Sequence, residues 1–382
     1  MLINGKRSLA YIAVITDIQP IPNADKIELA TVNHGWKVVV AKKDNFKVDD
    51  LVIYIEIDSK VPETEQFEFL KDRHYRVKTI KLRGQFSQGL IMPISAFPQL
   101  TNISLGMDVT DILGITYYVA EDNQRKNFDP NRELKSLEDR NKNLKNAFWW
   151  KFLIKRAWGR KILFKLFLKK NGKIPFPTKF PYIKKTDEER CENIADIVLG
   201  YKNPLIVTEK LDGTSCTYIL ERIKKNKFKF YVCSRNYALP EDDSIYWQLA
   251  NKYNIETKLK EYMSMNPDLE YVCIQGEGVG AVQNNPLKLE HNDLYVFNFI
   301  RSDTGRFNSI IGEHEVALMG MKWVPIIDTN YFVPNDMEEF KIYADGKSKV
   351  NPKVLREGVV LRDPSNDFSF KNVSRKYLAK AE

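Results

Sequence analysis

The chain is poor in the residues that build zinc sites and disulfide frameworks. Its four cysteines are scattered over 382 residues, and no two of them form a C-x-x-C pair. Neither a structural zinc site nor a disulfide framework is therefore indicated. This cysteine usage is typical of a reducing compartment, and we expect a cytoplasmic protein. The four histidines form no H-E-x-x-H or similar cluster, which argues against a histidine-based metal or catalytic site.

Long apolar runs are also missing. No apolar segment follows a charged N-terminus, so no signal peptide is indicated. The aromatic stretch 149–170 contains eight Lys or Arg residues, which excludes a transmembrane span there. We expect no membrane partner.

Acidic residues are absent from residues 141–185, which hold 14 Lys or Arg residues. Removing these 14 positive charges from the net charge of +9 leaves −5, so the basic character of the protein belongs to this one segment. A polyanionic partner there is consistent with this charge pattern.

Within the segment 141–185, the charges of residues 149–170 do not fall on one helical face. We favour a helical connector whose aromatic side chains pack on the next domain, over contact with nucleic acid or binding to anionic lipid.

The N-terminal part of the chain is rich in short β-strand patterns. Val- and Ile-rich runs are separated by turn residues such as Asn23 and Asp25. Six short strands in fewer than 100 residues predict a small closed or nearly closed β-barrel of the OB type. We assign residues 1–112 to this OB-like module and 113–175 to a charged, basic and partly helical linker. The expected strands are 9–17, 26–32, 36–41, 51–57, 75–82 and 89–93.

The rest of the chain, residues 176–382, has a mixed α/β pattern and is assigned to a second domain. Its expected strands are 205–209, 215–221, 228–234, 271–276, 294–300 and 357–362. Its expected helices are 187–199, 243–264 and 336–344. The chain is thus expected to belong to the α+β class.

The strongest chemical signal is the K-x-D-G motif formed by Lys210, Asp212 and Gly213. A buried strand delivers the lysine, and Asp-Gly allows a sharp turn after it. Lysine can attack a phosphorus atom only as the neutral amine. Its free pKa is about 10.4, so we expect burial or nearby cations to lower it. Asp212, two residues on, is placed to hold the shell of a metal ion. The plainer alternative is a surface Lys-Asp-Gly turn.

Further motifs follow the K-x-D-G motif in a fixed order. Two cations, Arg235 and Lys371, are suited to neutralise phosphate charges. Two carboxylates, Glu277 and Glu357, are acceptors suited to ribose hydroxyls or metal-bound water. Phe297 lies in an expected strand and offers a flat face for stacking on adenine, although it could equally be plain core.

This order of motifs resembles that of the covalent nucleotidyltransferases, the superfamily of nucleic acid ligases and capping enzymes. The resemblance implies an OB-like β-barrel followed by a nucleotidyltransferase (ATP-grasp-like ligase) domain with antiparallel sheets. It implies ATP as cofactor, with Mg²⁺ or Mn²⁺. Catalytic roles are implied for Lys210, Asp212, Glu357 and Lys371. Nucleotide-binding roles are implied for Glu209, Arg235, Glu277, Phe297 and Lys371, and metal-binding roles for Asp212, Glu277 and Glu357.

Within this superfamily, the chain looks like the fifth RNA ligase family, which carries its OB module at the front. The segments that carry this resemblance are 21–28, 82–85, 87–90 and 185–190. The chain ends four residues after Leu378, so we expect no C-terminal OB domain of the kind found in DNA ligases and capping enzymes. The implied reaction seals 3′-OH and 5′-phosphate RNA ends through lysyl–AMP, with a nicked duplex as the expected substrate and a monomeric enzyme.

One departure from the superfamily concerns its common Lys-x-Lys ending, because Ser369 stands where the first lysine is expected. Arg375 or Lys376 are candidates to replace that lysine. Lys185 and Arg190 are candidates for phosphate contact or for stabilising a helix that starts near residue 186.

Two rival functions remain from the sequence. A DNA ligase or a GTP-using capping enzyme would share the same motifs. A non-catalytic RNA-binding protein could combine an OB module with a degenerate ligase fold, but the intact acidic residues and Lys210 argue against it.

Overall fold

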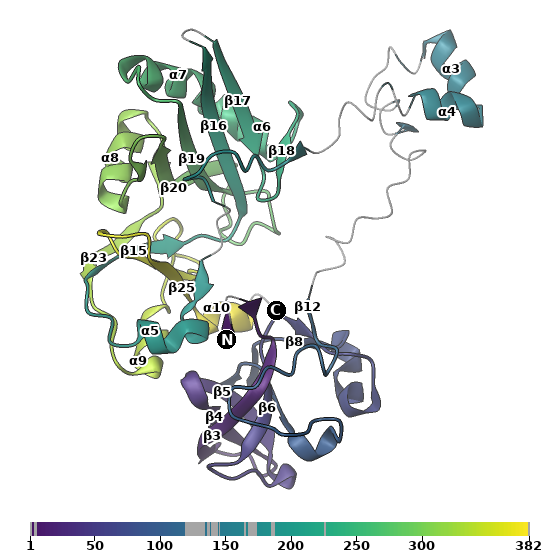
Figure 1. The fold of residues 1–382 in the computed structure, drawn as a ribbon, viewed down its shortest axis with the longest axis vertical. Coiled ribbons are helices and arrows are strands. Elements are labelled where there is room, and N and C mark those ends of the chain that lie inside the picture. Colours follow the sequence, from purple (N-terminus) through teal and green to yellow (C-terminus); the bar gives the residue numbers. More distant parts are fainter. Residues whose placement is uncertain are drawn as a thin grey trace.

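Two β-rich units make up most of the described chain, and a separate pair of short helices lies apart from both of them (Figure 1). The first unit contains the N-terminal strands, and the second contains the two larger sheets with their helices. Residues 119–133 and several shorter stretches of the predicted linker 113–175 lie outside the described residues, as does Lys185. A computed structural model describes residues 2–3, 6–118, 134–135, 138, 144, 146–163, 166, 174–184, 188–224 and 227–380.

The N-terminal unit is built on a five-stranded antiparallel sheet with the order β11-β6-β3-β4-β5. Burial alternates along β5, with Trp36, Val38 and Val40 buried on one face and the residues between them partly exposed on the other. This unit confirms the predicted OB-like module. Its strands are β3 (Ala10–Pro20), β4 (Ile27–Val32), β5 (Trp36–Ala41), β6 (Leu51–Ile55) and β11 (Leu90–Pro93).

Further pairing extends this unit beyond its main sheet. The hairpin of β9 (Ile80–Leu82) and β10 (Gln85–Ser87) lies beside β5, where the Val39 amide donates to Ser87 Oγ at 3.0 Å. A small second sheet joins β12 (Thr116–Tyr117) to β7 (Ser59–Lys60), so strand pairing in the module reaches Tyr117.

The second unit contains two sheets. The larger has eight strands, in the order β13-β18-β17-β16-β19-β20-β21, with β22 added alongside β20. Its outer strands are β13 (Ile174–Pro175), β18 (Tyr237–Leu239), β21 (Gly305–Arg306) and β22 (Lys322–Trp323). The smaller has five strands in the order β14-β25-β24-β15-β23, with β14 (Glu189–Arg190) and β23 (Ile326–Tyr331) at its edges. The strands that bear on the site are β15 (Leu205–Lys210), β16 (Thr214–Lys224), β17 (Lys227–Cys233), β19 (Tyr271–Val279), β20 (Asp293–Arg301), β24 (Gly358–Arg362) and β25 (Ser369–Val373).

Two of the three predicted helices of the second unit differ from the prediction. Within the predicted helix 187–199, the described residues form β14 (Glu189–Arg190), a short 3₁₀ turn and the single helical turn α5 (Ala195–Val198). The predicted helix 243–264 is two helices, α6 (Ile245–Lys252) and α7 (Ile255–Met265), because Asn254 adopts a left-handed conformation between them. The third is confirmed as α9 (Met337–Tyr343).

The basic aromatic stretch forms α3 (Phe148–Ile154) and α4 (Ala157–Leu163). Trp150 is buried in a small cluster with Leu134 and Leu163. The other aromatic side chains described in α3 and α4, those of Phe148, Trp149, Phe152 and Trp158, are exposed, so the interpretation in which they pack on the next domain is wrong for them. No helix within the described ranges is long and apolar enough to cross a membrane.

The two β-rich units meet through two arginines of the second unit. The Arg375 guanidinium, at the start of α10 (Arg375–Lys380), donates to Gln88 Oε1 of the module at 2.7 Å and to Glu338 of its own unit at 2.7 Å. The Arg190 guanidinium donates to Asp58 Oδ2 of the module at 3.1 Å. Separating the units would therefore remove the carboxylate partner of Arg190 and one hydrogen bond of Arg375, which would keep its ion pair with Glu338.

A buried ion pair inside the second unit provides a test of this packing. Lys341 and Glu192 are 1% and 2% exposed, and their charged atoms are 2.7 Å apart. Replacing Lys341 by Met should lower the free energy of unfolding by about 3–5 kcal/mol, because Glu192 then stays buried without its nearest cation. Urea denaturation followed by circular dichroism measures the loss.

The control for that experiment is the double variant Lys341→Met with Glu192→Leu, which removes both charges. It should lose less stability than the single variant, because no unpaired charge remains. An equal loss in the two variants would mean that packing of the lysine stem, and not the ion pair, stabilises this region.

Candidate active site

The end of β15 places Lys210 beside the E-G-V-V motif. Strand β15 pairs with β24, and Lys210 lies opposite Gly358 in that ladder. Glu357 therefore comes next to Lys210, although 147 residues separate the two in sequence. A Cβ atom on Gly358 would lie 2.4 Å from the Asn372 carbonyl oxygen, so this close approach of strands requires glycine.

The glycine of the K-x-D-G motif has a similar function. A Cβ atom on Gly213 would lie 2.3 Å from the carbonyl oxygen of Gly278 in β19. The turn after Lys210 thus packs directly on the strand that carries Glu277. The two glycines bring three motifs of the sequence to one place.

The Lys210 ammonium donates to Glu357 Oε2 at 2.6 Å. Burial lowers the pKa of Lys210, but the nearby carboxylates of Glu357 and Glu277 raise it more, and the net pKa is raised. Of the two expected causes of a lowered pKa, burial is outweighed by the carboxylates, and a nearby cation is the one that is left. The carboxylates keep the lysine charged, so a cation brought to the site is needed to release its proton.

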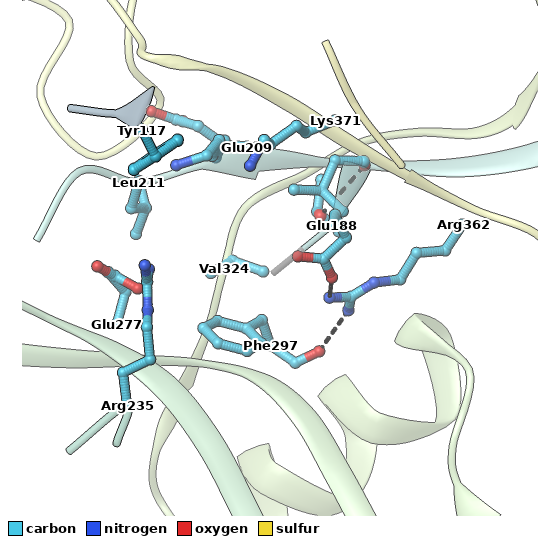
Figure 2. A pocket seen from close by; sticks show the side chains of 13 residues that line it. Tyr117, Glu188, Glu209, Leu211, Arg235, Glu277, Phe297, Val324, Arg362 and Lys371 are labelled. Carbon is cyan, nitrogen blue, oxygen red and sulfur yellow. Dashed lines mark hydrogen bonds and ion pairs between the residues drawn. The ribbon is translucent and has the colours of Figure 1, made fainter. Parts of the chain in front are cut away.

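Glu277 is the carboxylate most affected by this crowding. Burial, with the charges of Glu357 and Asp212 added, raises its pKa to about 8, against the opposing influence of Lys210 and Arg235. Figure 2 shows the Arg235 and Glu277 side chains next to each other at the edge of the pocket. Such a strongly shifted carboxyl group, next to a lysine in a cleft, is typical of functional sites.

Asp212 has a partner that the sequence did not predict. The Tyr377 hydroxyl, on α10, donates to Asp212 Oδ2 at 2.5 Å. The Asp212 carboxylate also raises the pKa of Lys210 and of Glu277. The three carboxylates of Asp212, Glu277 and Glu357 thus all raise the pKa of Lys210. Yet no three His, Cys, Asp or Glu side chains form a ready metal site in the parts of the chain that the structure describes.

A pocket of about 190 Å³ opens beside Lys210, between the two sheets of the second unit. Figure 2 shows the Phe297 ring extending along one wall of it, from the larger sheet. Of the predicted site residues, Asp212 and Glu357 are not part of its lining. The lining consists of Tyr117, Glu188, Thr208, Glu209, Lys210, Leu211, Arg235, Glu277, Phe297, Val324, Val360, Arg362 and Lys371.

Three charged or aromatic residues of the pocket, Tyr117, Glu188 and Arg362, were not singled out from the sequence. The Arg362 guanidinium donates to Glu188 Oε1 at 2.9 Å and to the Phe297 carbonyl oxygen at 2.6 Å (Figure 2). The Arg362 charge opposes the effect of burial on Glu188 and holds the pKa of that carboxyl below its usual value. Tyr117 comes from the last strand of the OB module. Arg362 ends the E-G-V-V-L-R segment, which was the signal that could have found it.

Lys371 lines the pocket from β25, opposite Val360. Neither candidate for the missing lysine reaches the pocket. Arg375 binds Gln88 and Glu338 at the interface of the units, and Lys376 pairs with Asp345 at 3.3 Å.

Two further residues that the sequence offered as candidates for nucleotide contact, Glu209 and Arg190, bind other parts of the protein. The Glu209 carboxylate is buried, and its Oε2 accepts from the Lys349 amide at 2.7 Å, although the residue also lines the pocket. Burial raises the pKa of Glu209. Arg190 belongs to a strand and pairs with Asp58, so the idea that it stabilises a helix is wrong.

Comparison with known proteins agrees with this geometry. Residues 203–380 match the family described as RNA ligase, and residues 9–94 match one described as an OB-fold domain. No curated protein matches the chain.

Solved structures of an RNA ligase from Naegleria gruberi match it over nearly its whole length. The structure with pyrophosphate is 30% identical, with a TM-score of 0.69, and the match covers 98% of this chain and 99% of the other. A glutamate-to-alanine variant with AMP and Mn is 30% identical, with a TM-score of 0.70 and the same coverage. A lysine-to-methionine variant with AMP and Mn is 30% identical, with a TM-score of 0.71 and the same coverage.

The match spans both β-rich units, and the separate family matches fall on the same two units. It therefore accounts for the OB module and for the domain that holds the pocket. Together with the motifs gathered around Lys210, this places the chain in the RNA ligase family.

Proposed function

We propose that this RNA ligase uses ATP and works through a covalent lysyl–AMP intermediate on Lys210. The observation that carries the proposal is the position of Lys210. Its ammonium lies 2.6 Å from Glu357, at the edge of a pocket that has an aromatic wall and several cations. A lysine held in this way is suited to attack one phosphorus atom of a nucleotide bound in the pocket.

The pocket has separate regions for the parts of ATP. Phe297 and Val360 offer flat and apolar surfaces to the adenine ring. Arg235 and Lys371 are placed to neutralise phosphate oxygens. The similar Naegleria ligase was solved with ATP and Mn and with AMP and Mn, which supports the assignment of ATP.

The carboxylates around Lys210 fit a divalent metal ion by their chemistry. Asp212, Glu277 and Glu357 are all oxygen donors, which Mg²⁺ and Mn²⁺ prefer. Because they do not form a closed cage, we propose that they hold the metal largely through its water molecules. The bound metal would supply positive charge that lowers the pKa of Lys210 and stabilises charge on the phosphates.

The proposed reaction has three steps. The neutral Lys210 amine forms a bond to the α-phosphorus of ATP, and the bond to pyrophosphate breaks. An RNA 5′-phosphate oxygen then attacks the same phosphorus, releasing Lys210 and leaving AMP on the RNA end. Finally the 3′-OH oxygen attacks the RNA phosphorus, AMP leaves, and the phosphodiester is made. Arg235 and Lys371 are placed to stabilise the negative charge in these steps.

We further propose that the enzyme acts as a monomer on 3′-OH and 5′-phosphate ends held in a nicked duplex. The OB module supports this, because its last strand contributes Tyr117 to the pocket. Arg362 is our candidate for the cation missing from the Lys-x-Lys motif, since it lies opposite Ser369 in the sheet and lines the pocket.

Replacing Lys210 by Ala tests the central proposal. The variant should not incorporate labelled AMP from ATP, a loss of more than about a thousandfold, because it lacks the nucleophile. It should still seal a strand that already carries AMP on its 5′ end. The matched control is Lys224→Ala, at an exposed hairpin end. Full labelling of the Lys210 variant would place the nucleophile elsewhere, and labelling by GTP in preference to ATP would contradict the cofactor.

The pH dependence of lysyl–AMP formation tests the carboxylate environment. Lys210 attacks as the neutral amine, so the rate should rise with pH until the pKa of Lys210 in the complex with metal and ATP is passed. The nearby carboxylates raise that pKa and so oppose the lowering by the metal. Replacing Glu277 by Gln removes one negative charge that raises this pKa. The midpoint of the pH profile should then move to lower pH by roughly one unit. Initial rates of AMP transfer between pH 6 and pH 10 would show the shift. An unchanged midpoint would mean that the Glu277 carboxylate does not affect the pKa of Lys210.

Substitutions in the basic run 71–83 test whether the OB module binds RNA. Lys81 and Arg83, on the β9–β10 hairpin, are exposed. Replacing both by Gln should weaken nick sealing more than AMP transfer, and should reduce the slope of RNA affinity against salt by about two units. The control is Lys224→Gln with Lys227→Gln, on the β16–β17 hairpin. Equal sealing by both double variants would show that this face does not bind the duplex.

A further inference from the structure

The α3–α4 helix pair has an unusual composition. Residues 147–170 consist of thirteen large apolar residues, eight basic residues, two alanines and one glycine. The segment thus has no acidic residue and no uncharged polar side chain. Soluble protein surfaces usually mix both signs of charge with uncharged polar side chains. This segment cannot form such a surface, because its only hydrophilic side chains are cations.

Six of the ten large apolar side chains that the structure describes in this segment are exposed. Phe148 is 85% exposed, Trp158 53% and Phe152 44%, and the aliphatic Ile162 and Leu166 are 42% and 57% exposed. The described side chains that are buried form a small group around Trp150. Soluble surfaces rarely gather so many apolar groups in one place without a partner.

Cations lie among these apolar groups. Lys151, Lys155 and Arg156 are exposed, and the Arg156 guanidinium lies 3.6 Å over the centre of the Phe152 ring. Aromatic and aliphatic side chains mixed with Lys and Arg are typical of helices that lie in the interface of an anionic membrane.

RNA, the other polyanion, fits this surface less well. Stacking on bases uses free aromatic faces, and Arg156 already covers one face of Phe152. The exposed aliphatic Ile162 and Leu166 gain nothing from phosphate or base edges. Uncharged polar side chains such as Asn, Gln, Ser and Thr, which also hydrogen-bond bases, are absent from 147–170.

We infer that the α3–α4 pair is a membrane-surface element, which holds this ligase on anionic lipid headgroups while Phe148, Phe152 and Trp158 enter the acyl boundary. The inference goes beyond the proposed function and does not depend on it. Figure 1 shows the pair apart from both β-rich units, so its binding to a surface leaves the pocket beside Lys210 accessible. Both contributions, apolar burial and charge attraction, are needed for lasting attachment to a membrane.

Vesicle co-sedimentation of the full chain tests this inference. The probes are vesicles of phosphatidylcholine alone and of equal parts phosphatidylcholine and phosphatidylserine. The chain should bind the anionic vesicles and bind them less as salt is raised. Replacing Phe148 and Trp158 by Ser should lower binding at least about tenfold. Replacing Lys151, Lys155 and Arg156 by Gln should lower binding to anionic vesicles by on the order of a hundredfold.

The matched control replaces two exposed apolar residues elsewhere, Phe69→Ser on the OB module and Leu318→Ser on α8 (Ser309–Leu318). It should bind vesicles as the unchanged chain does, and all variants should incorporate AMP normally. Failure of the unchanged chain to bind anionic vesicles would overturn the inference, as would an equal loss in the control.

Two other outcomes would assign the surface to a different partner. If the Gln variant loses salt-dependent RNA affinity and vesicle binding is unaffected, the surface binds RNA. If the Ser variant changes the mass measured by light scattering in the absence of lipid, the surface is covered by a second copy of the chain. Either result would overturn the membrane assignment.

Discussion

The negative charge around Lys210 is the constraint on which the rest of the site depends. Glu357 binds its ammonium, and Glu277 and Asp212 add to the field. The carboxylates that are suited to hold a metal ion are therefore the same groups that keep the lysine protonated. In the proposed chemistry, this arrangement keeps the nucleophile inactive until metal and nucleotide arrive together. The two strand contacts at Gly213 and Gly358 are what make such crowding possible.

Much of this could be predicted from the sequence, because motif residues and strand patterns are local. Five of the six expected strands of the OB module and the K-x-D-G strand follow from such patterns, whereas the expected strand 75–82 is two short strands, β8 (Arg76–Val77) and β9. The resemblance to the covalent nucleotidyltransferases implied site roles for Arg235, Glu277, Phe297 and Lys371, and all four line the pocket. The errors came from contacts between distant residues. The helix expected at 187–199 is mostly strand and turn, because Glu189 and Arg190 pair with β25. No local pattern predicts that pairing, nor that of Glu188 with Arg362.

The pocket is shared between sheets, and this explains why its residues are so widely spread in the chain. Lys210, Arg362 and Lys371 come from the smaller sheet, whereas Glu277 and Phe297 come from the larger one. The OB module adds Tyr117. The sequence could identify each group by type, but the electrostatic effect of one on another appears only when the sheets are brought together.

The short helix α10 has two attachments that lie only two residues apart. Arg375 fixes it to Gln88 of the OB module, and Tyr377 fixes it to Asp212 beside the nucleophile. A rotation of the module must therefore either carry the helix with it or break the hydrogen bond between Arg375 and Gln88. In the first case the Tyr377 hydroxyl moves away from Asp212, and in the second a buried hydrogen bond is lost. The position of the OB module is thus linked, through one short helix, to a carboxylate beside the nucleophile.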